Sequence, residues 1–381
     1  PVADCPRVAY YEAAAAALDE GRPLTAEGAT WVADDLWHAR AAELRVERAA
    51  EHEARELTHE GAVMPFWFSV HGDAPRGDGG GRSLYISMHG GGGTAARVND
   101  QQWENQKRLY SIDEGVYVAP RAPTNTWNLW HQGHIDPLFA RLITNMILFE
   151  GVDPDRVYLL GYSAGGDGVF QLAPRMADRF AAAAMMAGHP NETRPDGLRN
   201  LPFGLHMGER DGAYQRNEHA ATWKQLLADL RAADPAGYDH QVEIHAGKGH
   251  WMDRQDAVAL PWMAERTRDL RPERIVWLQD DVTHDRFYWL KVDEPKARAR
   301  VVVEREGQTV RILEAKDVDR LTIRLDDTMM DLDEPVRVEH AGRVLFEGRV
   351  ERQRRVVEQT LAERDDPRGM FSAQLTVDLT P

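Results

Sequence analysis

Short apolar runs alternate with helical segments between residues 63 and 270, and this alternation restricts the fold more than any other feature of the sequence. A strand followed by a helix, repeated several times, is typical of a mostly parallel sheet with helices on both faces. We therefore expect an α/β domain over residues 63–271. The predicted strands are 64–72, 83–90, 115–123, 156–163, 182–188, 202–209 and 241–247, and the predicted helices are 105–114, 137–151, 217–234 and 255–270.

The chain on either side of this domain has a different pattern. Residues 1–62 are rich in Ala, Glu and Arg, and apolar residues recur at helical spacing from Trp31 to Leu44, which predicts a helical extension. Residues 272–381 contain short strand-like runs separated by turns, with one helical segment at 352–364. This pattern predicts a β-rich, sandwich-like C-terminal domain.

An aromatic group lies close to the start of the β-rich domain and consists of Trp277, Phe287, Tyr288 and Trp289. Contacts between domains of one chain are a common use of such residues, so we expect an interdomain core rather than a glycan-binding platform. The C-terminal domain is therefore expected to stabilise the protein and to supply none of the chemistry.

Charge and composition exclude several classes of function. The chain has 46 Lys and Arg against 62 Asp and Glu, a net charge of −16, which disfavours binding to nucleic acid. The longest strongly apolar stretch, 180–188, is too short to span a bilayer, and the single cysteine, Cys5, excludes an intrachain disulfide. We expect a soluble protein, either cytoplasmic or exported with a trimmed N-terminus; no oligomeric state follows from the pattern.

The most informative motif is Gly161-Tyr162-Ser163-Ala164-Gly165, which directly follows an apolar strand and precedes a helical stretch. In this context a serine lies on a sharp strand-to-helix turn with its hydroxyl exposed. Glycines flank it because side chains there would collide with the neighbouring strand and helix. The motif therefore makes Ser163 the candidate nucleophile.

A second glycine-rich motif, His89 to Gly93, ends the strand predicted at 83–90. Acyl transfer needs backbone N–H donors directed at the developing oxyanion, and glycines allow the backbone to approach the substrate. We expect one donor from Ala164 and another from Gly91 or Gly92. His89 is expected to stabilise the loop rather than to act as a base.

A serine nucleophile needs a base, and the base needs a carboxylate that orients it. Asp211 and His250 each follow a predicted strand, where catalytic groups gather at the carboxyl edge of an open α/β sheet. The predicted catalytic triad is therefore Ser163, Asp211 and His250. The rival carboxylates are Asp196, Asp253 and Asp256, and the rival histidine, His245, is expected to be structural.

The segments HGGGG, DRVYLLGYSAGG, MGERD and GKGHW together resemble α/β-hydrolase serine esterases of the dienelactone-hydrolase-like group, which includes proteins labelled as predicted peptidases. The C-terminal stretch resembles a β-domain appended to some bacterial members. The resemblance implies an α/β-hydrolase fold and hydrolysis of carboxylic esters through an acyl-enzyme, with no cofactor and no metal. Two alternatives stay open: a serine peptidase or amidase with the same triad, and an inactive scaffold that binds glycan or protein.

Aromatic side chains close to these motifs are candidates for substrate binding. They are Tyr162, Trp127, Trp130 and Trp251, although simple packing is an equally ordinary use of each tryptophan. His131, His134 and Asp136 have a loose metal-ligand spacing, which is a weaker alternative for the same loop. About a dozen residues separate the strands ending at 188 and starting at 201, too few for a helical lid. We therefore expect a small-molecule or polymer-end ester as substrate.

Overall fold

The computed structural model describes residues 22–73 and 80–380; Cys5 and the first part of the predicted N-terminal extension lie outside these ranges. The chain divides into two compact units, Glu47–Asp269 and a second unit that combines the residues up to Val46 with those from Leu270 onward. Helix α2 (Ala26–Ala54) runs through the boundary at Val46. The domain limits expected from the sequence, 62 and 271, stay predictions about which segments fold independently.

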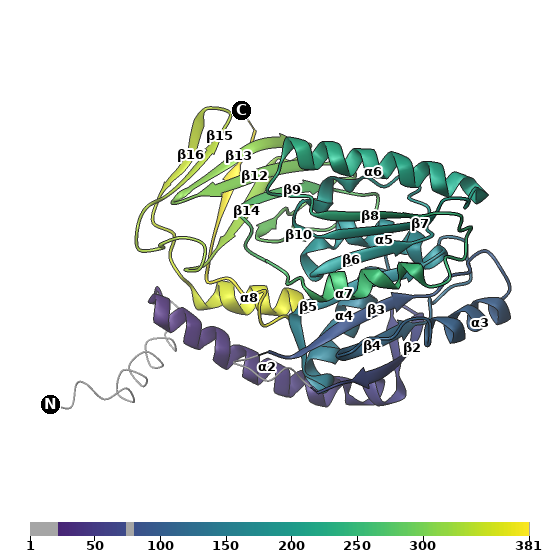
Figure 1. Ribbon diagram of the computed structural model, residues 1–381. Coiled ribbons are helices and arrows are strands. Elements are labelled where there is room, and N and C mark those ends of the chain that lie inside the picture. Colours follow the sequence, from purple (N-terminus) through teal and green to yellow (C-terminus); the bar gives the residue numbers. More distant parts are fainter. Residues whose placement is uncertain (1–21, 74–79, 381) are drawn as a thin grey trace. The chain divides into compact units, whose positions relative to one another are not determined.

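The unit Glu47–Asp269 is built on an eight-stranded sheet with the order β1-β2-β4-β3-β5-β6-β7-β8 (Figure 1). Strand β2 is antiparallel to both of its neighbours, whereas the strands from β4 to β8 are parallel. The mostly parallel sheet expected from the sequence is therefore confirmed. The strands are β1 (Glu56–His59), β2 (Ala62–His71), β3 (Arg82–Met88), β4 (Gly115–Pro120), β5 (Val152–Tyr162), β6 (Ala182–Met186), β7 (Phe203–Gly208) and β8 (His240–His245).

Helices cover both faces of this sheet. Consecutive residues of β5, Leu159 and Leu160, point to opposite faces and are both fully buried. On one face, Leu160 packs in a cluster with Leu260 and Met263 of the short helix α7. The helices of this unit, besides the end of α2, are α3 (Ala96–Gln106), α4 (Ile135–Glu150), α5 (Ala164–Arg175), α6 (Arg216–Ala233) and α7 (Ala259–Ala264).

The helix predicted at 105–114 is wrong, because α3 occupies 96–106 and the chain then turns toward β4. The two buried residues of α3 are polar, Asn99 and Gln106, so the helix lacks the apolar stripe that a sequence pattern detects. Tyr110 and Ile112, which suggested a helix, are buried in the segment that leads into β4. Helix α7 is also shorter than predicted.

The second unit contains two β-sheets, as the β-rich prediction requires. Their strand orders are β16-β15-β13-β12-β9 and β10-β11-β14-β17. Helix α8 (Arg354–Arg364) confirms the one helix predicted there. The strands are β9 (Arg274–Leu278), β10 (Arg286–Phe287), β11 (Leu290–Lys291), β12 (Arg300–Glu306), β13 (Thr309–Lys316), β14 (Arg320–Leu325), β15 (Val336–His340), β16 (Arg343–Gly348) and β17 (Ala373–Asp378).

The rings of the C-terminal aromatic group contact one another. Trp277 stacks on Phe287 with 5.7 Å between ring centroids, Phe287 meets Tyr288 edge-on at 4.8 Å, and Trp289 Nε1 donates to the carbonyl of Pro272 at 3.0 Å. All of these contacts lie within the second unit. The group therefore contributes to the internal packing of the unit that carries it.

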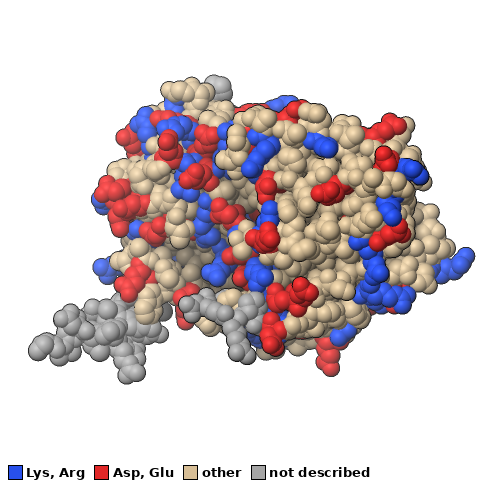
Figure 2. All heavy atoms as spheres, in the orientation of Figure 1, with Lys and Arg blue, Asp and Glu red and all other residues tan. Residues whose placement is uncertain are grey.

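Charged side chains of both signs are interspersed on the face drawn in Figure 2. Charges of opposite sign also pair within the C-terminal sheets; for example, Arg337 pairs with Glu339 of its own strand at 2.5 Å and with Glu347 of β16 at 2.6 Å. The net negative charge is therefore not gathered into one acidic patch on this face. Among the described helices, none is both long and apolar enough to cross a membrane.

Candidate active site

Ser163 lies at the sharp turn between β5 and α5. Its backbone has φ 57° and ψ −121°, a conformation that costs energy for any residue with a side chain and that clusters at functional sites. Glycines are required on both sides because a Cβ on Gly161 would lie 2.2 Å from the carbonyl oxygen of Gly165, and a Cβ on Gly165 would lie 2.1 Å from that of Met88. The turn therefore holds the serine hydroxyl at the carboxyl edge of the sheet.

The structure brings the side chains of Ser163, His250 and Asp211 into one hydrogen-bonded chain. His250 follows β8, and its Nε2 lies 2.9 Å from Ser163 Oγ. Its Nδ1 lies 2.7 Å from Asp211 Oδ2, in the loop after β7. A carboxylate accepts only, so Nδ1–H donates to Asp211 and leaves the Nε2 lone pair for the serine proton.

The carboxylates that could compete for this histidine have other partners. Asp253 pairs with Lys248 at 2.6 Å, and Asp196 pairs with Arg194 at 3.2 Å. Asp256 is buried and accepts a hydrogen bond from Tyr110. Asp211 is itself 2% exposed, so the carboxylate that meets His250 is held out of water.

Tyr162 contacts the loop that carries His250. Its hydroxyl donates to the backbone carbonyl of His250 at 2.6 Å and accepts from the N–H of Met252 at 3.1 Å. Burial raises the pKa of this hydroxyl above its ordinary value, so it remains a donor over the whole working range of pH. That Tyr162 binds substrate stays a prediction; its hydroxyl holds the loop of His250.

The backbone N–H groups of the glycine loop after β3 and of Ala164 differ in their hydrogen bonding. The N–H of Gly92 donates to Asn99 Oδ1 at 2.8 Å. The N–H groups of Gly91 and Ala164 make no hydrogen bond with residues 22–73 or 80–380. Gly91 has φ +106°, and a Cβ there would lie 2.2 Å from Asn99 Oδ1, so only glycine is compatible with this turn.

Two buried side chains support that loop from behind. Trp130, predicted as a substrate wall, is fully buried and donates its Nε1–H to the carbonyl of His89 at 3.0 Å. His89 Nε2 accepts from the N–H of Ala122 at 3.1 Å. Burial lowers the pKa of His89 to about 4, so the ring is neutral at pH 7 and can keep accepting this bond.

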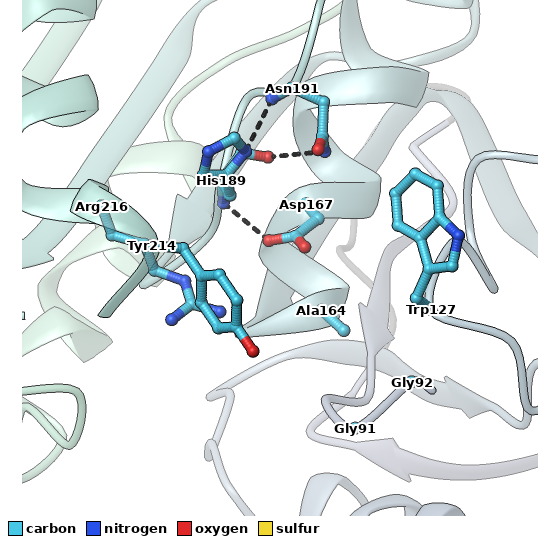
Figure 3. A pocket seen from close by; sticks show the side chains of 9 residues that line it. All are labelled: Gly91, Gly92, Trp127, Ala164, Asp167, His189, Asn191, Tyr214 and Arg216. Atoms are coloured by element: carbon cyan, nitrogen blue, oxygen red, sulfur yellow. Dashed lines mark hydrogen bonds between the residues drawn. The ribbon is translucent and has the colours of Figure 1, made fainter. Parts of the chain in front are cut away.

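A cavity of about 340 Å³ opens beside the serine turn, and Figure 3 shows the residues that line it. Trp127 and Tyr214 lie on opposite sides, and Asp167 lies between them. Burial raises the pKa of Asp167 to about 6. The lining residues are Gly91, Gly92, Trp127, Ala164, Asp167, His189, Asn191, Tyr214 and Arg216.

The remaining aromatic and metal-site candidates occupy different environments. Trp251 is 51% exposed next to His250, and its ring contacts Tyr162 with 5.8 Å between centroids. Asp136 forms a buried ion pair with Arg175 at 2.6 Å. One carboxylate oxygen of Asp136, a member of the possible metal-ligand group at 131–136, is therefore already paired with a cation.

Five cavity residues were missed by the sequence analysis: Asp167, His189, Asn191, Tyr214 and Arg216. For three of them, the position in the sequence could have indicated a place in the site. Asp167 is two residues beyond the serine motif, and Tyr214 and Arg216 closely follow Asp211 in the loop at the carboxyl end of β7. Their composition alone, without this position, does not distinguish them from ordinary surface residues.

Part of this unit is similar to a known protein family. Residues 119–270 match the dienelactone hydrolase family. The candidate esterase NocK of Nocardia uniformis subsp. tsuyamanensis is 31% identical over 158 residues, which cover 38% of this chain and 44% of NocK. The chain therefore spans less than half the length of that relative. The match confirms the family resemblance and the α/β-hydrolase fold class expected from the sequence.

Solved structures of an esterase and of a depolymerase are similar to somewhat more than half of the chain. A thermostable esterase is 19% identical with a TM-score of 0.44, over 56% of this chain and 62% of that protein. LpqC of Bordetella parapertussis, described as a poly(3-hydroxybutyrate) depolymerase, is 17% identical with a TM-score of 0.41, over 55% of this chain and 86% of LpqC.

Proposed function

We propose, from the dienelactone hydrolase family domain formed by residues 119–270, that this chain is a serine hydrolase that cleaves carboxylic esters through an acyl-enzyme. The observation that carries the proposal is the chain of two hydrogen bonds from Ser163 Oγ through His250 to Asp211, at 2.9 and 2.7 Å. A nucleophile, a base and an orienting carboxylate in this arrangement can activate a serine hydroxyl at neutral pH.

In the first half of the reaction, Ser163 Oγ attacks the ester carbonyl carbon while its proton moves to His250 Nε2. The resulting imidazolium is stabilised by the Asp211 carboxylate. The tetrahedral intermediate collapses when the bond to the alcohol oxygen breaks. His250 then returns its proton to the leaving alkoxide, and the acyl group remains as an ester of Ser163.

The oxyanion of the intermediate needs N–H donors that are not already engaged. The N–H groups of Gly91 and Ala164 meet this requirement and line the same cavity, whereas that of Gly92 donates to Asn99. We therefore assign the oxyanion hole to Gly91 and Ala164, with Gly92 supporting the loop.

In the second half, water replaces the alcohol. His250 Nε2 takes a proton from the water as its oxygen attacks the acyl-enzyme, and the same two N–H groups hold the second oxyanion. The intermediate then expels Ser163 Oγ, which regains its proton from His250. The products are a carboxylic acid and the free enzyme. A serine peptidase or amidase would use the same steps with an amine as the leaving group.

The proposal is tested with p-nitrophenyl acetate and a fluorophosphonate probe. We expect turnover and covalent labelling in the unaltered protein, and loss of both in Ser163→Ala. The matched control is Ser111→Ala, because Ser111 is an exposed serine outside the site. Equal, unsaturable rates in all three proteins would contradict the proposal. Ethyl esters and the corresponding amides, compared at equal concentration, distinguish an esterase from an amidase.

A further inference from the structure

The cavity beside the serine turn opens next to the N–H groups proposed to hold the oxyanion. His250 Nε2 must deliver a proton to the leaving oxygen, so the alcohol part of the ester lies on the His250 side. The cavity is lined by Gly91 and Ala164, which would hold the oxyanion, but not by His250. The space next to the oxyanion donors, which His250 does not line, is therefore available to the acyl group.

Arg216 supplies this cavity with a cation that has spare hydrogen-bond donors. The residue is 9% exposed, and its Nε has no hydrogen-bond partner in the described part of the chain. Nη1 donates to the carbonyl of Ala213 at 3.4 Å and forms an ion pair with Asp211 Oδ1 at 4.0 Å, without a hydrogen bond between them. Nε is enclosed by protein atoms, whereas Nη2 makes no hydrogen bond with the described part of the chain, so the donors of Nη2 remain available.

Asp167 supplies the same cavity with an acceptor. Its Oδ1 accepts from the N–H of His189 at 2.6 Å, and the described chain offers no hydrogen bond to Oδ2. The His189 loop is itself held by the N–H of Asn191, which donates to His189 Nδ1 at 2.9 Å. The carboxylate is thus anchored by one oxygen and presents the other.

We infer that the acyl group taken by this cavity carries a hydroxyl, which donates to Asp167 and accepts from Arg216. The inference rests on the proposed ester hydrolysis and names the substrate class for that site. A hydroxyl is the smallest group that satisfies a donor and an acceptor together. A plain alkyl chain would displace water from both charged groups without replacing its hydrogen bonds. A second carboxylate on the acyl group would be repelled by ionised Asp167.

The walls of the cavity fit a short carbon chain that bears such a hydroxyl. Trp127 and Tyr214 lie on opposite sides of it, as Figure 3 shows, and are 63% and 76% exposed. Tyr214 and Gln215 both have positive φ, at 53° and 57°, a conformation that costs energy for residues other than glycine. The rings present apolar faces to the carbon chain while the polar groups lie between them.

The test compares three methyl esters by titration of the acid released at pH 8: methyl β-hydroxybutyrate, methyl butyrate and monomethyl succinate. We expect kcat/KM to be at least about tenfold higher for the hydroxy ester than for either of the others. Only the hydroxy ester can form hydrogen bonds with both Asp167 and Arg216. Equal Ser163-dependent hydrolysis of all three would overturn the inference and leave the proposed function standing. Faster hydrolysis of the succinate would assign an anionic acyl group instead.

Variants then assign the preference to residues. Asp167→Asn keeps an acceptor for His189 but cannot accept through a charged oxygen, and Arg216→Gln removes the cation. Each is expected to reduce the hydroxybutyrate-to-butyrate ratio by about fivefold or more, whatever happens to the absolute rates. The controls Asp229→Asn and Arg231→Gln, both on α6, should leave the ratio unchanged. An unchanged ratio in the site variants would overturn the assignment, whereas no Ser163-dependent hydrolysis of any ester would refute the proposed function itself.

Discussion

At the residue scale, the imidazole of His250 has to stay in one place while its proton moves. Its ring is bonded at both nitrogens, and its backbone is held by Tyr162, the residue next to the serine in sequence. The side chain of Tyr162 thus connects the serine turn to the loop that carries the base. Loss of that connection would displace the base by a fraction of an ångström, which matters because proton transfer depends on a short, aligned approach.

Tyr162→Phe is therefore expected to lower kcat on small esters by about tenfold and to change KM by less than twofold. Labelling by a fluorophosphonate should slow by a similar factor. The matched control is Tyr158→Phe on the same strand, which removes a hydroxyl that donates to the carbonyl of Arg266 at 2.8 Å, away from the His250 loop. Both variants should lose about 1 kcal/mol of unfolding free energy. Equal effects of the two on kcat would show that Tyr162 acts only through stability.

Asp167 makes the free energy of unfolding depend on pH. Burial raises its pKa from 3.8 to about 6, so the folded protein binds more protons than the unfolded chain between these values. The free energy of unfolding therefore falls as pH rises from about 4 to 6. Asp167→Asn cannot ionise and should be more stable than the unaltered protein at pH 8, by about 1–3 kcal/mol.

That gain should vanish below about pH 4, where the aspartate is protonated in both states. Melting temperatures of both proteins across pH 4–8 measure it. The control, Asp229→Asn, removes an exposed carboxylate on α6 and should show no such trend. A gain of the same size at every pH would refute the linkage to Asp167.

At the scale of elements, the strand β5 and helix α5 approach so closely at the serine turn that only glycine fits at Gly161 and Gly165. The contacts are backbone to backbone, which cannot be relieved by a change of rotamer. Helix α5 must therefore move away from β3 and β5 if a side chain is added.

Gly165→Ala is expected to destabilise the unit by more than 3 kcal/mol, or to prevent folding, because its Cβ would lie 2.1 Å from the Met88 carbonyl oxygen. Gly212→Ala is the matched control, since a Cβ there meets no atom within 4 Å and its φ is −79°. Urea unfolding of both variants measures the difference. Equal stability of the two would contradict the close packing of the turn.

At the scale of the whole molecule, the start of α2 packs within the C-terminal unit. Leu24, Ala29 and Val32 form a cluster with Val357 and Leu361 of α8. These apolar side chains lose their partners if the C-terminal residues are removed. We propose, as the sequence analysis predicted, that the C-terminal domain stabilises the protein rather than supplying its chemistry.

A chain of residues 22–269 should consequently be less soluble than the full protein, because the apolar face of α2 is uncovered. A chain of residues 47–269 lacks that face and should be more soluble than 22–269, with retained activity on small esters. Sedimentation, melting temperature and p-nitrophenyl acetate turnover test the pair. A 22–269 chain as stable as the full protein that has lost binding to a polymer or glycan would make the C-terminal domain a recognition module.

The sequence by itself determined the seven core strands, the serine turn and the loops that carry Asp211 and His250. These features depend on local patterns, because apolar runs specify buried strands and a parallel sheet places the ends of its strands at one edge. It did not predict the position of α3, whose buried residues are polar.

Only the tertiary structure decided which partners the side chains and backbone groups around the serine have. It engages the N–H of Gly92 with Asn99, turns Tyr162 to a carbonyl 88 residues away, and buries Trp130 beneath the glycine loop. It also brings Asp167 and Arg216 into one cavity. Such partnerships join residues from different elements, so they depend on how helices and loops pack on the sheet, which no local pattern in the sequence records.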